Sequence, residues 1–289
     1  MVNWRKRRRV QLAFFVKGNI IMHTLLPRRA LLAAAAALAF GAALPAQAQE
    51  TIKVGATAVP HAELLEQVKP ALKAAGIELQ IVEFSDYVQP NLAVNDGQLD
   101  ANFFQHRPYL DSFNTDRKTT LAVVEGGDIH IEPFGAYSRR VKALTELKEG
   151  AQVAIPNDPT NGGRALLLLQ QAGLIKLKDA KNLSSTPLDV VENPKKLKFR
   201  ELEAAQLPRS LDDVDLALIN TNYALQAGLN PLTDALVIEG KESPYVNVVV
   251  SREADAKKPA LVRLTQELRT PAIKQFILDK YKGAVAPAF

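Results

Sequence analysis

The chain has 289 residues, of which 47% are hydrophobic, and it has no cysteine and a formal net charge of +5. This length allows one large or two medium domains, and the composition excludes collagen-like, coiled-coil and disordered classes. The lack of cysteine excludes a disulfide framework, a thiolate nucleophile and cysteine-ligated metal sites.

The first 48 residues predict a secretory signal peptide. They contain eight basic residues and no acidic one, and Arg28 and Arg29 precede an apolar run from Ala30 to Ala43. Ala46-Gln47-Ala48 then matches the A-x-A pattern of a cleavage site. The apolar run is shorter than the ~20 residues of a membrane-spanning helix, which disfavours a retained anchor.

Cleavage after Ala48 would reverse the sign of the charge. The chain has 36 Lys and Arg against 31 Asp and Glu, so loss of the eight basic residues of the leader leaves −3. The basic surplus therefore belongs to the leader, and nucleic acid is not an expected partner.

After the leader, strand patterns alternate with helix patterns. The predicted strands are 52–56, 77–84, 152–155, 198–202, 215–220 and 245–251. The predicted helices are 60–75, 85–94 with Ser85 as the N-cap, one that follows the turn 157–163 and ends at Ala172, a short one near Tyr223, and two more up to about Lys282. This alternation predicts an α/β protein with mainly parallel sheets, and the lack of a long linker means that two lobes would share the chain by crossing over.

Motifs for catalysis are missing from the sequence. It has no nucleophile elbow, no phosphate-binding lysine loop and no zinc-binding helix motif. Of the four histidines, His23 lies in the leader, and His61 and His130 are expected to be structural. We therefore predict no enzyme, no metal and no cofactor, with a secreted enzyme as the alternative of a different class.

Arg164 is a candidate ligand for a carboxylate. It follows the polar turn 157–163 and is predicted to lie in the first turn of the next helix. A helix N-terminus binds anions through unpaired N–H groups, and an arginine adds a fork that matches a carboxylate. An ordinary surface arginine near a helix cap is the alternative.

Two asparagines lie beside apolar strands. Asn220 follows 214–219, and Asn247 lies within 245–250. Each amide could be a buried structural group or could line a ligand cleft. Because ligands of open α/β sheets bind beyond the carboxyl ends of strands, Asn220 is favoured as a lining residue, with Asn222 as its competitor.

An aromatic cluster follows the second predicted strand. Its members are Tyr87, Phe103, Phe104, His106 and Tyr109. Most aromatic side chains belong to the core. Phe104, His106 and Tyr109, however, lie at a predicted strand-to-helix junction, where they could wall a pocket for an apolar, polarisable side chain.

At these residues the sequence resembles the methionine-binding components of bacterial ABC importers, the NlpA-type lipoprotein family. The matching stretches are F-S-D-Y-V-Q-P-N from Phe84, F-Q-H-R-P-Y-L-D from Phe104, P-N-D-P-T-N-G-G-R-A-L-L-L-L from Pro156, L-K-D from Leu177, D-V-V-E-N-P-K from Asp189, L-E-A-A-Q-L-P-R-S-L-D-D-V-D from Leu202, I-N-T-N-Y-A from Ile219 and K-E-S-P-Y-V-N from Lys241. They cover nearly the whole chain after the leader and are highly specific together.

The resemblance implies a two-lobed periplasmic-binding-protein fold, type II-like, with the ligand in a cleft between lobes that crossover strands join. Lobe one would comprise residues 49–136 and 247–289, and lobe two residues 137–246. The resemblance further implies that Arg164 pairs with the ligand's carboxylate and that Asn220 and Asn247 hold its amino and carboxylate groups. The pocket around the thioether would consist of Tyr87, Phe104, His106 and Tyr109.

The implied function is a monomeric receptor that captures methionine and delivers it to an ABC permease and its ATPase at the inner membrane. A receptor of the same fold for another amino acid or a methionine analogue is the alternative. Family members usually carry an acylated cysteine after the signal peptide, and this chain has none. We therefore expect a soluble periplasmic protein. Gly162-Gly163 before Arg164 also departs from the family pattern and is expected to add backbone freedom.

Overall fold

The computed structural model describes residues 49–240 and 243–289, so the predicted signal peptide lies outside the described residues. The described residues belong to one compact unit. Within the described ranges, no helix has both the length and the apolar character that crossing a membrane requires.

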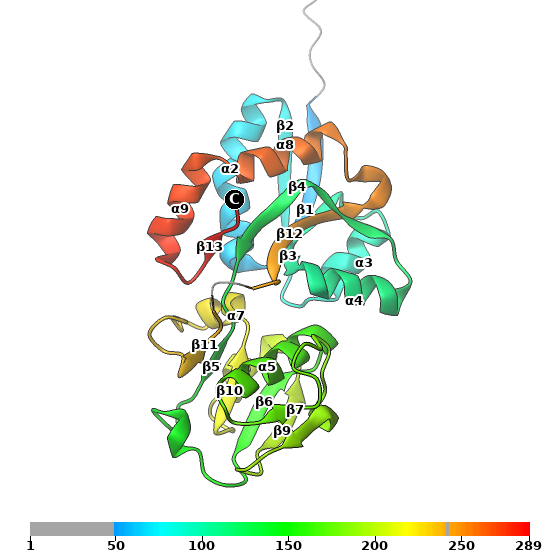
Figure 1. Ribbon diagram of the computed structural model, residues 1–289. Helices are drawn as coiled ribbons and strands as arrows, with labels where there is room; N and C mark the ends of the chain where they lie inside the picture. The colour runs from blue at the N-terminus through cyan, green and yellow to red at the C-terminus, as the bar shows by residue number, and fades with distance from the viewer. Residues whose placement is uncertain (1–48, 241–242) are drawn as a thin grey trace, which may run out of the picture. The chain divides into compact units, whose positions relative to one another are not determined.

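A six-stranded sheet combines strands from the two ends of the described chain (Figure 1). The strand order is β13-β4-β12-β3-β1-β2, in which β1 is parallel to β2 and β3 while β12 is antiparallel to β3 and β4. The strands are β1 (Glu50–Ala56), β2 (Ile77–Glu83), β3 (Ala101–His106), β4 (Leu121–Ile131), β12 (Val246–Arg252) and β13 (Ala286–Pro287).

Helices cover both faces of this sheet. On one face α2 (Glu63–Ala74), α8 (Pro259–Leu268) and α9 (Pro271–Tyr281) share an apolar core with Val249 of β12. On the other face α3 (Gln89–Asn95) and α4 (Arg107–Arg117) share a core with Val248 and Val250. Successive valines of β12 divide between the two cores because strand side chains alternate in direction.

A five-stranded sheet holds the middle of the chain. Its order is β11-β5-β10-β6-β9, in which β6 is parallel to β9 and β10 and β5 is antiparallel to its neighbours. The strands are β5 (Gly135–Tyr137), β6 (Gln152–Pro156), β9 (Lys198–Leu202), β10 (Leu216–Ile219) and β11 (Val237–Ile238). One core holds residues of α5 (Pro159–Gln171), and a second holds residues of α6 (Leu207–Ser210) and α7 (Thr221–Gln226). The remaining short elements are β7 (Lys176–Leu177), β8 (Val190–Glu192), η1 (Ala58–Ala62), η2 (Leu144–Glu146), η3 (Pro187–Asp189), η4 (Ala204–Gln206) and η5 (Glu253–Asp255).

The chain passes between the two sheets twice. The first crossing follows β4 and includes Glu132, and the second follows β11 and includes Glu239. The limits of the two predicted lobes fall near these crossings, and they stay a prediction. Each crossing segment carries a carboxylate, which brings acidic side chains to the region between the strands of the two sheets.

Two predictions about the fold are wrong in detail. The sheets are mixed rather than mainly parallel, because β12 enters the first sheet antiparallel to both of its neighbours. The predicted helix 85–94 begins only at Gln89, because the Asp86 carboxylate accepts hydrogen bonds from the backbone N–H groups of Val88 and Gln89 at 2.8 Å. Periodicity reveals neither the direction of a strand nor the residue at which a helix begins.

Candidate ligand-binding site

One pocket draws its lining from both sheets and their connections. It encloses about 340 Å³ not occupied by protein atoms, including open solvent at its mouth. All the predicted site residues lie in its wall, which consists of Tyr87, Phe104, Gln105, His106, Tyr109, Glu132, Asn161, Arg164, Asn220, Thr221, Asn222 and Asn247.

The aromatic part of the wall forms where β3 passes into α4, as the sequence predicts. The Tyr87 ring lies 5.8 Å from the Phe104 ring and 5.9 Å from the Tyr109 ring, between centroids. The Tyr109 hydroxyl donates to the carbonyl oxygen of Tyr87 at 2.9 Å, which ties the two segments together. Phe103 belongs to the core on the opposite face of the sheet, because it is the strand neighbour of Phe104.

His106 presents its ring to the pocket as a neutral group. Its Nδ1 accepts from the backbone N–H of Tyr109 at 3.1 Å as the N-cap of α4, and its Nε2 lies 3.1 Å from Asn161 Oδ1. Burial lowers the pKa of His106 to about 3. Because the protein uses both ring nitrogens, what His106 offers a ligand is mainly its carbon surface.

Asparagines supply much of the polar part of the wall. Asn161 Nδ2 donates to both oxygens of Asp158 at 3.0 Å, and Asn161 Oδ1 accepts from Asn220 Nδ2 at 2.7 Å. Asn222 Oδ1 accepts from the Tyr87 hydroxyl at 2.6 Å. Among the described residues, Asn220 Oδ1 and Asn222 Nδ2 are buried without a hydrogen-bond partner. The wall therefore holds one unpaired acceptor and one unpaired donor, and such groups are costly to bury unless a ligand or water pairs with them.

Arg164 lies in the pocket wall, but not in the first turn of its helix as predicted. Helix α5 begins earlier, at Pro159, where Asp158 caps it by accepting from the backbone N–H of Asn161 at 2.9 Å. The turn 157–163 contains residues that a helix also tolerates, so its polar composition concealed the true start. The N-terminus of α5 is thus paired with Asp158 rather than offered to an anion.

The guanidinium of Arg164 is held by another carboxylate of the protein. Its Nε donates to Glu239 Oε1 at 3.1 Å and its Nη2 to Glu239 Oε2 at 2.5 Å. Its Nη2 also donates to the backbone oxygen of Glu132 at 2.8 Å, and its central carbon lies 4.0 Å from the centre of the Tyr245 ring. The side chain is only 3% exposed, so its position is tightly determined.

The glycine pair before Arg164 serves close packing and not backbone freedom. A Cβ at Gly163 would lie 2.2 Å from the backbone oxygen of Leu183, and a Cβ at Gly162 would lie 2.9 Å from that of Pro156. Both residues are inside α5. The expectation of added flexibility is therefore wrong, since these glycines let two backbone segments approach α5.

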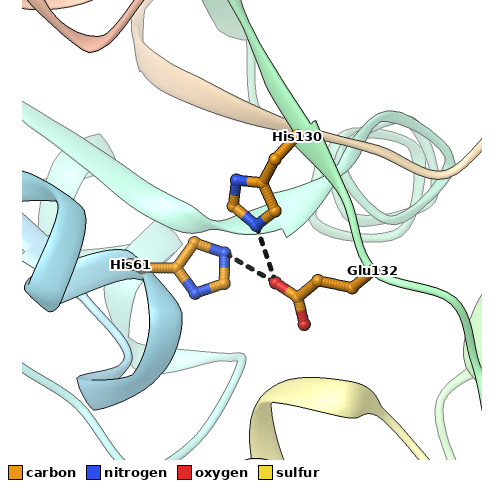
Figure 2. Close-up of side chains that lie close together, drawn as sticks. All are labelled: His61, His130 and Glu132. Carbon is orange, nitrogen blue, oxygen red and sulfur yellow. Dashed lines mark hydrogen bonds and ion pairs between the residues drawn. The ribbon is translucent and has the colours of Figure 1, made fainter. Parts of the chain in front are cut away.

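Sequence reasoning missed the buried carboxylate of Glu132. It lines the pocket at the first crossing, and burial raises its pKa. Figure 2 shows its Oε1 facing His130 Nε2, at 2.8 Å, and His61 Nε2, at 3.4 Å. The one local signal was an acidic residue between apolar Ile131 and Pro133, directly after a strand.

The same three side chains have the composition of a metal site. In the described residues, the ligand atoms of His61, His130 and Glu132 lie within 4.8 Å of one another, and all three side chains are buried. Two imidazoles and a carboxylate can bind zinc or iron. His130 and Glu132 are two residues apart, but His61 lies far before them in the sequence, so no spacing motif predicted the cluster.

The comparisons with known proteins identify the family. The model of the family described as "NlpA lipoprotein" matches residues 52–289. The chain belongs to the NlpA lipoprotein family. It is 51% identical over 235 residues to "D-methionine-binding lipoprotein MetQ" of Escherichia coli K12, covering 80% of this chain and 86% of that protein. The same name is given to a relative from Yersinia pestis, with 52% identity over 240 residues and coverage of 82% and 88%.

A solved structure of the family agrees with the fold. The structure of "a nutrient binding protein from Burkholderia cenocepacia bound to methionine" is 47% identical with a TM-score of 0.79, covering 82% of this chain and all (100%) of that one. The chain has the two-lobed periplasmic-binding-protein fold, and this prediction is confirmed.

The family name contradicts the expected location. We expected a soluble periplasmic protein without a lipid anchor, but the family and the relatives from Escherichia coli and Yersinia pestis are named as lipoproteins. That expectation is wrong. It was based on the absence of one residue type, and a missing side chain reports on a single attachment chemistry rather than on where a protein is located.

Proposed function

We propose that this protein is the substrate-binding receptor of an ABC importer and that its ligand is methionine. The observation that carries the proposal is a pocket with charged and amide groups at one part of its wall and aromatic rings at another. A free amino acid with an apolar side chain needs this combination. The names of the Escherichia coli and Burkholderia relatives support methionine as that amino acid.

The polar groups match the two charges of an amino acid. Arg164 and the unpaired Nδ2 of Asn222 are donors, which suit a carboxylate. The unpaired Oδ1 of Asn220 is an acceptor, which suits an ammonium group. The Oδ1 of Asn247 faces His61 Nε2 at 3.1 Å, so its Nδ2 is the group that Asn247 can offer the ligand's carboxylate.

The aromatic groups suit the thioether. Tyr87, Phe104, His106 and Tyr109 lie together, and sulfur makes favourable contacts of about 0.3–1.5 kcal/mol with aromatic rings. The four rings belong to two segments joined by the Tyr109 hydroxyl, which keeps this wall rigid.

Transport would proceed by closure of the lobes. We assign residues 49–136 and 247–289 to lobe one and residues 137–246 to lobe two. Methionine that contacts both lobes would favour the closed state, with hinge motion at the two crossings. The closed receptor would then bind, as a monomer, to a permease with its ATPase. In this role the protein is not an enzyme and needs no cofactor.

Calorimetry with the purified chain tests this function. L-methionine, D-methionine and the other apolar amino acids are titrated in turn, and native mass spectrometry of fresh protein identifies any retained ligand. Methionine should bind most tightly and be recovered unchanged. If another amino acid binds more tightly than methionine, that amino acid is the ligand. Conversion of methionine to a product would indicate an enzyme instead.

A further inference from the structure

The Arg164 side chain connects α5 to both segments that pass between the sheets. Its Nη2 donates to the backbone oxygen of Glu132, in the first crossing, at 2.8 Å. Its Nε and Nη2 donate to the carboxylate of Glu239, in the second crossing, at 3.1 and 2.5 Å. One guanidinium group thus joins three segments that are distant along the chain, and a movement of either crossing would change its position.

The two crossings are also bonded to each other at this point. The backbone N–H of Glu239 donates to the backbone oxygen of Phe134 at 2.8 Å, and the backbone N–H of Phe134 donates to Glu239 Oε2 at 3.5 Å. The Ser243 hydroxyl donates to the same Oε2 at 3.4 Å. Glu239 therefore binds Arg164 while its own backbone is fixed on the first crossing, which restricts the directions that its carboxylate can take.

Two buried aromatic rings restrict the guanidinium of Arg164 further. Its central carbon lies 4.0 Å from the centre of the Tyr245 ring and 5.1 Å from the centre of the Phe134 ring, both within the range of cation–π contacts. Phe134 lies between β4 and β5, in the first crossing, and Tyr245 lies between β11 and β12, in the second. Each crossing supplies one ring and one hydrogen-bond acceptor, so the orientation of Arg164 depends on both.

These contacts determine what Arg164 can offer a ligand. Glu239 and Glu132 bind its Nε and Nη2, whereas its Nη1 has no hydrogen-bond partner within residues 49–240 and 243–289. Arg164 also lines the pocket. Because the guanidinium is planar, fixing two of its nitrogens fixes the direction of the N–H groups on the third. Glu239 thus sets the direction in which Nη1 points.

We propose that Glu239 is a positioning residue that orients Arg164 toward the carboxylate of the ligand and links that carboxylate to both crossings. A ligand that binds Arg164 then acts directly on the hinge, because the same guanidinium is bonded to both segments that must bend. This inference rests on the proposed function. It adds a residue that lies behind Arg164, outside the wall of the pocket.

The test compares methionine with methionine amide, in which a neutral carboxamide replaces the carboxylate. Dissociation constants of both ligands are measured by calorimetry at about pH 6, where both amino groups are protonated. The wild type should prefer methionine. Glu239→Gln keeps the shape of the side chain but removes its charge and one acceptor, so this preference should narrow about tenfold or more. Glu239→Asp keeps the charge and should give an intermediate preference. A merely structural role would weaken the binding of both ligands equally.

Glu192→Gln is the matched control. Glu192 also pairs with a basic side chain, that of Lys176 at 2.6 Å, but this pair is exposed and neither residue lines the pocket. The same chemical change should here keep the wild-type preference. If Glu239→Gln does not fold, Glu239→Asp carries the test, because its shorter side chain cannot hold Arg164 in the same position and should still narrow the preference.

The link to the hinge is measured as a distance between the lobes. The chain has no cysteine, so spin labels attach only at introduced ones, here Lys73→Cys in α2 and Lys148→Cys after η2, both at exposed positions. Pulsed EPR then gives the closed fraction at saturating ligand. Methionine should close the wild type more completely than methionine amide does, and Glu239→Gln should reduce this difference.

Several results would overturn the inference. One is an unchanged preference for methionine over its amide in Glu239→Gln, or in Glu239→Asp where the first variant does not fold. Others are an equal narrowing in Glu192→Gln and an equal closure of the wild type by the two ligands. A wild type that binds no methionine at all would overturn the proposed function itself, which separates the two failures.

Discussion

Replacement of Arg164 by alanine gives the sharpest test of the binding site. The side chain is 3% exposed and forms a two-pronged ion pair with Glu239. Arg164→Ala therefore removes the proposed partner of the methionine carboxylate and also leaves Glu239 without its cation. Two losses are expected, one in affinity and one in stability.

The sizes of the two losses follow from burial. Truncating one partner of a buried, hydrogen-bonded charge pair costs about 2–5 kcal/mol of binding, or roughly 30- to 5000-fold in the dissociation constant. Breaking a buried ion pair costs about 3–5 kcal/mol of unfolding free energy. Glu239 is 15% exposed, so water can partly solvate it, and we expect the free energy of unfolding to fall by about 3 kcal/mol.

A second substitution separates the two losses. In the double variant with Glu239→Gln, the unpaired charge is gone, so part of the unfolding free energy should return while methionine affinity stays low. Affinity is measured by calorimetry and stability by urea unfolding of the same preparations. Methionine affinity within threefold of the wild type in Arg164→Ala would refute the reasoning and leave Arg164 a structural ion-pair residue.

Two other predictions concern stability. Gly163→Ala puts a methyl group 2.2 Å from the Leu183 oxygen and should lower the free energy of unfolding by about 1–3 kcal/mol. Gly240→Ala is the control, because no atom lies within 4 Å of the added carbon, and it should change the free energy of unfolding little. Equal melting temperatures for the two variants would contradict this prediction. His106, with its pKa lowered to about 3, binds a proton in the unfolded but not the native state between about pH 6.5 and 3, so acid should reduce stability there by up to about 1.4 kcal/mol per pH unit. In His106→Gln, the free energy of unfolding measured with urea should fall less steeply between pH 7 and 4 than in the wild type. The same pH dependence in both proteins would show that His106 does not cause the loss of stability in acid.

Local sequence patterns determined much of the pocket. The junction that holds Phe104, His106 and Tyr109 follows from an apolar strand that runs into a helix start, and both features involve adjacent residues. Asn220 was favoured because it follows a buried strand, and it lies in the pocket wall. Motifs of this kind also carried the resemblance to the family, so the fold could be predicted from the sequence alone.

Only the tertiary structure decided how the charges are paired. His61, His130 and Glu132 meet because η1 and the end of β4 pack together, and Glu239 reaches Arg164 from the second crossing. Periodicity and capping depend on neighbours within a few residues, whereas these contacts join segments that are distant along the chain. The antiparallel direction of β12 between β3 and β4 could not be predicted from the sequence for the same reason. The sequence thus determined which residue types reach the pocket, and folding determined which carboxylate is paired with an arginine and which one faces two histidines.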